Sequence, residues 1–238
     1  MTKILAHRGA SGYCPENTMK AFEKALMLSA DGLELDIHLT KDQRLVVIHD
    51  FTLNRTTNGK GLIKDVTYRE LCSLDAGSWF SPQFRNEKIP LLKDVFHLVD
   101  NIEHTINIEI KAGNRYYPSI EELILEEIHK WAKCNIILSS FDHFALRNIK
   151  LNDPDKTTGI LYEASFIDIC NYAIDKVNAD ALHPNYMTLD KDLFQNAKKN
   201  CLQINPYTVD HPLTMKNLIN LGVDHLITNY PDIALSLL

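Results

Sequence analysis

Short runs of apolar residues recur along the chain, and most are separated by segments whose apolar positions have the spacing of an amphipathic helix. Strands that alternate with helices predict parallel β-α units. Closing this many units favours an α/β fold, a (β/α)8 TIM barrel, over an open sheet. The predicted strands are 3–8, 32–39, 44–49, 105–111, 135–141, 157–163, 179–184, 202–209 and 224–229.

Two of the predicted helices carry start signals. In 119–133 the apolar residues share one face, and Ser119 with Glu122 has the spacing of a capping box. A second helix is predicted over 18–30, with Asn17 as its N-cap. Both helices would cover the outside of the barrel.

One connection breaks the alternation of strands and helices. Strands 32–39 and 44–49 are joined by 40–43, which is too short for a crossover and predicts an antiparallel hairpin. Pairing around this turn places residues whose numbers sum to about 85 opposite each other. We therefore expect Asp36 to face His49.

The stretch 50–104 lacks convincing strands. It holds a capping-box sequence at Thr67 and Glu70, a loop rich in Gly, Ser and Pro, and a helical pattern at 91–100. We interpret it as a small insertion on the active-site side of a single barrel domain that spans 1–238.

Composition narrows the class of protein. The chain has 238 residues, 45% of them hydrophobic, and a net charge of −6, which argues against nucleic acid as the main partner. Its five cysteines show no paired spacing, which indicates reduced thiols and a cytoplasmic protein. Neither a signal peptide nor a transmembrane segment is expected. The oligomeric state is left open.

Acidic residues gather at predicted strand ends, where parallel barrels form their active sites. Glu34 and Asp36 lie on one face of a strand, about 7 Å apart along it. Glu109 lies on the next parallel strand. Three carboxylates suit Mg²⁺ or Ca²⁺ better than zinc. The alternative is that each acid only pairs with Arg8 or Lys111.

Two of the ten histidines, His7 and His49, end strands and are candidates for acid–base catalysis, because imidazole titrates near neutral pH. The other eight receive no role, and His183 is the least secure of these. Arg8 suits a forked contact to phosphate oxygens, with Lys111 as a point charge beside it. Arg8 can alternatively pair with Glu16.

These residues belong to a recognisable pattern. The segments HRGASGYCPENT, ADGLELDIHLTKD and LVVIHDFTLNRTTNGKG, followed by IPLLKDV, NIEIK, SSFD and GVDHLITNYPD, cover nearly the whole chain. Together they resemble the glycerophosphodiester phosphodiesterase family. The resemblance implies a phospholipase-C-like phosphodiesterase barrel with a small insertion after the second histidine.

The resemblance also implies roles for single residues. They are the acid–base pair His7 and His49, the metal ligands Glu34, Asp36 and Glu109, the phosphate contacts Arg8 and Lys111, and the first-loop residues Glu16 and Asn17, which organise one side of the substrate site. One position departs from the family. A tryptophan that packs on the substrate is replaced by Tyr207, which is either a substrate contact or a core or rim aromatic residue.

The predicted reaction is metal-dependent hydrolysis of a glycerophosphodiester to glycerol 3-phosphate and an alcohol such as choline or ethanolamine. The head group, the metal and the assignment of acid and base are left open. Three alternatives remain: a lyase that releases a cyclic phosphate, a non-catalytic phosphodiester-binding protein, and a Schiff-base aldolase that uses Lys111.

Overall fold

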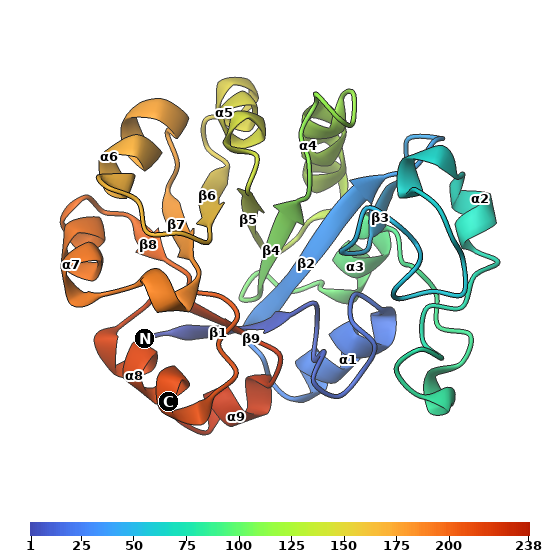
Figure 1. Ribbon diagram of the computed structural model, residues 1–238, viewed down its shortest axis with the longest axis horizontal. Coiled ribbons are helices and arrows are strands. Elements are labelled where there is room, and N and C mark those ends of the chain that lie inside the picture. The colour runs from blue at the N-terminus through green and yellow to red at the C-terminus, as the bar shows by residue number, and fades with distance from the viewer.

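The computed structural model describes residues 1–238 and forms a nearly closed barrel of parallel strands surrounded by helices (Figure 1). The strands are β1 (Lys3–His7), β2 (Gly32–Leu39), β3 (Leu45–Val47), β4 (Thr105–Ile110), β5 (Asn135–Ser140), β6 (Thr157–Tyr162), β7 (Ala181–Pro184), β8 (Gln203–Ile204) and β9 (His225–Thr228). Eight of these nine strands run parallel in the order β8-β7-β6-β5-β4-β2-β1-β9, while β3 pairs antiparallel with β2. The predicted (β/α)8 barrel is confirmed.

The barrel closes between β8 and β9 through single backbone hydrogen bonds. The amide of Asp224 donates to the carbonyl of Ile204 at 3.0 Å, and the amide of Ile227 donates to the carbonyl of Pro206 at 3.1 Å. All nine predicted strands contain an observed strand, although β8 is only two residues long. Beyond β8, the predicted strand continues only as an isolated parallel bridge between Tyr207 and Asn185.

Helices fill the connections on the outside of the barrel (Figure 1). They are α1 (Met19–Met27), α2 (Tyr68–Leu71), α3 (Leu92–Leu98), α4 (Ile120–Trp131), α5 (His143–Asn152), α6 (Ile169–Tyr172), α7 (Lys191–Lys199), α8 (Pro212–Leu221) and α9 (Pro231–Leu235). None of these helices has the length and apolar composition that crossing a lipid bilayer requires.

Two predicted helix starts are wrong, and a third is confirmed. Ser119 adopts a left-handed conformation, and its side chain makes no capping hydrogen bond, so no capping box starts α4. The N-cap of α1 is Thr18, because the side chain of Asn17 is used elsewhere. The capping box of Thr67 and Glu70 is present at α2.

The predicted β2–β3 register is wrong by one residue. Observed partners such as Ile37 and Val47 have numbers that sum to 84, and the amide of Ile48 donates to the carbonyl of Asp36 at 3.0 Å. Asp36 is therefore opposite Ile48 and not His49. The register follows from the turn, in which the amide of Thr40 donates to the carbonyl of Arg44 at 3.0 Å and Gln43 is left-handed (φ 56°), so that pairs counted outward from Thr40 and Arg44 sum to 84.

Alternation along the strands separates the core from the chemistry. Leu33, Leu35 and Ile37 of β2 are fully buried in a hydrophobic cluster that also contains residues of α1, α3 and α4. The side chains between them, Glu34 and Asp36, point to the opposite face, which is the barrel interior. Because side chains alternate along β2, the residues that face the helices are apolar and the two acids both point into the barrel.

The segment that links β3 to α3 has a hydrophobic cluster of its own. Val46 of β3 packs there with Ile63, Leu71 and Ile89, and all four side chains are buried. In Figure 1 this segment with α2 lies outside the barrel beside the end of β3. Helix α3, by contrast, packs into the main core.

Histidines fill part of the barrel interior. His183 is fully buried, its Nε2 lies 2.9 Å from Asn205 Nδ2, and the Oδ1 atom of Asn205 lies 2.9 Å from Nδ1 of His225. Gly159 makes room for these hydrogen-bonded side chains, because a Cβ at this position would lie 2.3 Å from Nε2 of His183. Burial lowers the pKa of His183 to about 3 and that of His225 to about 4.

These buried histidines predict a loss of stability in acid. They stay neutral in the folded chain but bind protons near pH 6.5 when unfolded, so the free energy of unfolding falls as the pH drops from about 6.5 toward 4. Each contributes a slope of about 1.4 kcal/mol per pH unit while it titrates. Urea denaturation at several pH values should show a shallower slope for His183→Asn. The exposed His129→Asn variant is the control, and an unchanged slope in His183→Asn would contradict this account.

Candidate active site

Three carboxylates of β2 and β4 meet level with the C-terminal ends of β1 and β4, because Glu34 pairs with His7 and Asp36 pairs with Glu109. One oxygen each of Glu34, Asp36 and Glu109 lies within 4.8 Å of the others, and all three side chains are buried. They come together because Glu34 and Asp36 share a face of β2, and Asp36 is in register with Glu109 on β4. The sequence analysis predicted this cluster.

The chemistry of the cluster fits a divalent cation. All donors are carboxylate oxygens, which Mg²⁺ and Ca²⁺ prefer. Oδ1 of Asp36 and Oε1 of Glu109 are buried, and apart from Lys111 neither has a polar partner in the protein. The ammonium group of Lys111 lies 3.4 Å and 2.6 Å from these two oxygens. The carboxylates of Asp36 and Glu109 therefore already share one cationic group, the ammonium of Lys111.

Electrostatics within the cluster differ from one carboxyl group to the next. Burial and the neighbouring Asp36 and Glu109 raise the pKa of Glu34 well above its ordinary value. Burial also acts to raise the pKa of Asp36, but Arg8 and Lys111 outweigh it and hold that pKa low. Burial and Asp36 raise the pKa of Glu109. Three acids beside two fixed cations leave the site short of positive charge, so it favours a proton or a metal ion.

His7 presents one ring nitrogen to the site. Its Nδ1 lies 2.7 Å from Oδ1 of Asn229, whose amide group in turn donates to Asp210 at 2.5 Å. Because the amide nitrogen of Asn229 faces Asp210, its oxygen accepts from Nδ1–H of His7. Nε2 is left unprotonated, 3.8 Å from Glu34 Oε2. Burial and Arg8 lower the pKa of His7 to about 4.

His49 is held in the same way. Its Nδ1 donates to Oδ1 of Asp50 at 2.7 Å, which leaves Nε2 free. Burial lowers its pKa, against the raising effect of Asp36. The backbone carbonyl of His49 accepts from Nε2 of His38 at 2.9 Å, and the hydroxyl of Tyr117 lies 2.7 Å from the other nitrogen of His38. His38, to which the sequence analysis gave no role, thus supports His49.

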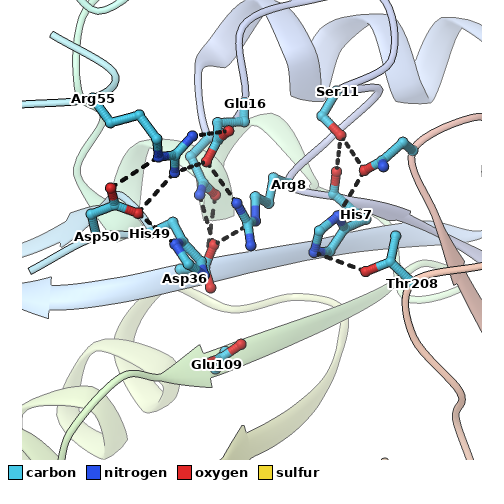
Figure 2. A network of polar contacts seen from close by, with 12 residues as sticks. His7, Arg8, Ser11, Glu16, Asp36, His49, Asp50, Arg55, Glu109 and Thr208 are labelled. Atoms are coloured by element: carbon cyan, nitrogen blue, oxygen red, sulfur yellow. Dashed lines mark hydrogen bonds and ion pairs between the residues drawn. The ribbon is translucent and has the colours of Figure 1, made fainter. Parts of the chain in front are cut away.

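Figure 2 shows His7 and His49 on the two sides of Arg8, with Asp36 next to His49 and Glu109 below them. Nη1 of Arg8 donates to Glu16 at 2.8 Å, and its Nε lies 3.3 Å from Asp36. The ion pair with Glu16 that was considered as an alternative therefore exists. Nη2 has no protein partner, so the guanidinium keeps a free edge for an anion.

Arg55 lies at the centre of a network that the sequence analysis missed (Figure 2). Its guanidinium donates to Asp50 at 2.8 and 2.9 Å and to Glu16 at 2.7 and 2.8 Å. One residue of the segment after β3 thereby holds the partner of His49 and the partner of Arg8 at the same time.

This network predicts that Arg55→Ala lowers kcat by roughly 10-fold or more, because Asp50 and Glu16 lose their shared cation and His49 and Arg8 lose their fixed positions. Steady-state kinetics should show a smaller change in KM. Lys60→Ala, an exposed cation nearby in the chain, is the control. A wild-type kcat in Arg55→Ala would show that the network does not position the site.

The other predicted residues have defined partners as well. The side chain of Asn17 donates to Asp36 at 2.8 Å, and Glu16 lies between two arginines, so both hold other groups of the site. The hydroxyl of Tyr207 donates to the carbonyl of Tyr162 at 3.1 Å, which leaves its ring as the surface that a ligand can meet. Asp50, Arg55 and Asn229 were missed, although Asn229 ends the predicted strand 224–229 and the other two follow the predicted strand 44–49 within six residues.

The chain is similar to known proteins over nearly its whole length. A family model described as the glycerophosphoryl diester phosphodiesterase family matches residues 7–233. A glycerophosphodiester phosphodiesterase of Caldanaerobacter subterraneus subsp. tengcongensis is 43% identical over 237 residues, 99% of this chain and 97% of the relative. One from Bacillus altitudinis is 42% identical and covers 100% of this chain and 98% of its own length.

A solved structure is similar across the whole chain. It is a phosphodiesterase of Oleispira antarctica in complex with the product sn-glycerol-3-phosphate, with a TM-score of 0.93 and 26% identity. The alignment covers 100% of this chain and 96% of that protein.

Proposed function

The chain belongs to the glycerophosphodiester phosphodiesterase family, and from this premise we propose that it hydrolyses glycerophosphodiesters to glycerol 3-phosphate and an alcohol by His/His acid–base catalysis at a metal-binding carboxylate cluster. The observation that carries this mechanism is the geometry of the cluster. Three buried carboxylates lie beside two histidines whose Nδ1 atoms are both held, so that each turns Nε2 to the site, where that of His7 lies 3.5 Å from the hydroxyl of Thr208.

Glu34, Asp36 and Glu109 would hold Mg²⁺ or Ca²⁺, which supplies positive charge for the phosphate oxygens and lowers the pKa of a bound hydroxyl. Arg8 and Lys111 share the remaining phosphate charge. Asn17 keeps Asp36 oriented through its 2.8 Å hydrogen bond.

The two histidines divide the proton transfers. One Nε2 takes the proton of the attacking hydroxyl, which is either water or the 2-OH of glycerol, and the protonated form of the other donates to the leaving alcohol. The low pKa of both rings keeps them neutral before substrate arrives. The negative phosphodiester favours protonation of one ring, because an opposite charge raises the pKa of a histidine.

Further features support the setting of this reaction. We propose a single barrel domain in which residues 50–104 are an insertion, and the contacts of Arg55 with the site support a role for this segment in catalysis. The five cysteines are all free thiols, which supports a reducing compartment such as the cytoplasm. The acidic net charge of −6 supports a small-molecule substrate rather than nucleic acid.

Phosphorus NMR of glycerophosphocholine turnover tests the reaction itself. The proposed function predicts that the diester signal is replaced by glycerol 3-phosphate. A cyclic glycerophosphate that accumulates as the end product would instead assign the chain to the lyase reaction. An unchanged diester signal with every divalent metal would contradict the substrate assignment.

A further inference from the structure

Asp210 lies one hydrogen bond beyond the partner of His7. Its Oδ2 accepts from Nδ2 of Asn229 at 2.5 Å, and Oδ1 of Asn229 lies 2.7 Å from Nδ1 of His7. Its Oδ1 accepts from the backbone amide of Asn229 at 2.9 Å and from the hydroxyl of Thr228 at 3.0 Å. Both carboxylate oxygens of Asp210 are therefore occupied by donors from the end of β9 and the residue that follows it.

Closure of the barrel brings these residues together. Strand β9 pairs with β1, in which Ala6 is in register with Thr228, so His7 and Asn229 are the next residues of the two chains. On the other side of β9, the amide of Val209 donates to the carbonyl of Ile227 at 2.9 Å. The segment after β8 is thereby held against β9, and the residue after Val209 reaches Asn229.

The two histidines of the site are held by partners of different chemistry. His49 is held by the carboxylate of Asp50, which only accepts hydrogen bonds, so its Nδ1 must carry the proton. His7 is held by the amide of Asn229, which can present either its oxygen or its NH2 group. With the oxygen toward His7, Nδ1 is protonated. With the NH2 group toward His7, Nδ1 accepts, and the proton of the neutral ring moves to Nε2.

The other polar contacts of this network fit both orientations of Asn229. The hydroxyl of Ser11 lies 2.6 Å from Oδ1 of Asn229 and 2.7 Å from the carbonyl of His7 (Figure 2). It can donate to Asn229, or accept from it and donate to the carbonyl. A proton on Nε2 of His7 would face Oε2 of Glu34 at 3.8 Å, which is an acceptor. Asp210 alone distinguishes the two orientations, because its oxygens accept and do not donate.

We propose that Asp210 is a positioning residue, which fixes the tautomer of His7 through Asn229 and so keeps Nε2 unprotonated and able to accept a proton from the substrate side. This inference rests on the proposed function, because it gives Asp210 a part in the proton transfers of His7. Asp210 itself touches neither the histidine nor the carboxylate cluster, and acts only by turning the NH2 group of Asn229 away from the ring.

Asp210→Asn has a defined consequence in this network. The oxygen of the new amide is required at the position of Oδ1, because the backbone amide of Asn229 and the hydroxyl of Thr228 both donate there. Its NH2 group then takes the position of Oδ2 and faces the side chain of Asn229. Asn229 turns its oxygen toward this donor and its NH2 group toward His7, so the proton of the neutral ring moves from Nδ1 to Nε2.

Exchanging the two side chains restores the original tautomer. In the double variant Asp210→Asn/Asn229→Asp, the amide at position 210 donates to the carboxylate at position 229. That carboxylate also accepts from Nδ1–H of His7, so every hydrogen bond of the network is made. The tautomer separates this role from a purely structural one, because a loss of packing does not move a proton between the two ring nitrogens.

Nitrogen-15 NMR of protein labelled at histidine reads the tautomer without turnover, at neutral pH, where His7 is uncharged. The signals of His7 are those that are missing in His7→Gln. We expect a protonated Nδ1 and an unprotonated Nε2 in the wild type and in the double variant, and the reverse in Asp210→Asn.

Steady-state kinetics with glycerophosphocholine follow the same variants. We expect kcat of Asp210→Asn to fall at least ~10-fold with KM within about twofold, and kcat of the double variant to return to within about threefold of the wild type. Asp232→Asn is the matched control. This carboxylate accepts from the hydroxyl of Tyr13 at 2.9 and 3.0 Å, so its loss should change neither kcat nor the tautomer of His7.

A neutral ring with the proton on Nε2 in the wild type, or an unchanged tautomer in Asp210→Asn, would overturn the inference. Wild-type kcat in Asp210→Asn, despite an exchanged tautomer, would overturn it as well. If Asp210→Asn does not fold, the double variant decides, because it must show the wild-type tautomer and rate. If the wild type hydrolyses no glycerophosphodiester, the proposed function fails, while the spectra still decide whether Asp210 sets the tautomer.

Discussion

Replacing His49 or His7 by Ala is expected to lower kcat for glycerophosphocholine hydrolysis by at least ~10², because each removes a proton donor or acceptor from the transition state. The exposed fraction is 30% for the side chain of His49 and 15% for that of His7, so we expect the barrel to stay folded without them. Circular dichroism should therefore be unchanged while kcat falls. Since Asp50 and Asn229 hold both Nδ1 atoms, the effect should arise at Nε2 in both variants.

His211→Ala provides the matched control. This histidine is exposed and precedes α8, where its side chain makes no capping hydrogen bond. It should keep wild-type kcat and KM. Near-normal rates in both His7→Ala and His49→Ala would rule out the acid–base pair, whichever of the two is the base.

Asp36→Asn is expected to lower activity by at least ~100-fold and to weaken binding of Mg²⁺ or Ca²⁺ in parallel. Asp36 is fully buried and close to every charged group of the site, namely Arg8, Lys111 and the other two carboxylates. Asn has the same shape as Asp but carries no charge. Without the negative charge of Asp36, Arg8 and Lys111 lose a shared counter-ion, and the cluster loses one metal ligand.

Calorimetric titration with Mg²⁺ and with Ca²⁺, alongside the kinetics, separates these two effects. An exposed change of the same kind, Asp65→Asn, should alter neither metal binding nor rate. Full metal affinity in Asp36→Asn would show that the cation binds elsewhere.

The barrel could be predicted because strand and helix patterns alternate so regularly. Each apolar run marks a strand that is buried on its outer face, as β2 shows with Leu33, Leu35 and Ile37. The β2–β3 register and the N-cap of α4 were predicted wrongly, because each depends on the backbone conformation of a single residue. The hairpin turn that contains the left-handed Gln43 closes at Thr40 and Arg44, which shifts the β2–β3 register by one residue, and the left-handed Ser119 removed the expected cap of α4. Sequence spacing does not reveal which non-glycine residue adopts this conformation.

The same division holds within the site. The carboxylate cluster could be predicted because alternation on β2 and the neighbouring position of β4 fix it. Arg55 and Asn229 were missed because their roles depend on contacts across long stretches of chain, up to 222 residues between Asn229 and His7. Asn229 directly follows β9, so a search of every strand end for polar residues could have found it.

Tyr207 is the residue where sequence and structure together change the interpretation most. Its hydroxyl is engaged by the carbonyl of Tyr162, so the aromatic face is the feature that it shares with a tryptophan.

Release of glycerol 3-phosphate from glycerophosphocholine, measured in EDTA and again after Mg²⁺ or Ca²⁺ is restored, tests the central claim most directly. The carboxylate cluster predicts that release stops in EDTA and returns with at least one of the two metals in the wild type, but not in Asp36→Asn. Undiminished release in EDTA, or no release with either metal, would contradict the account.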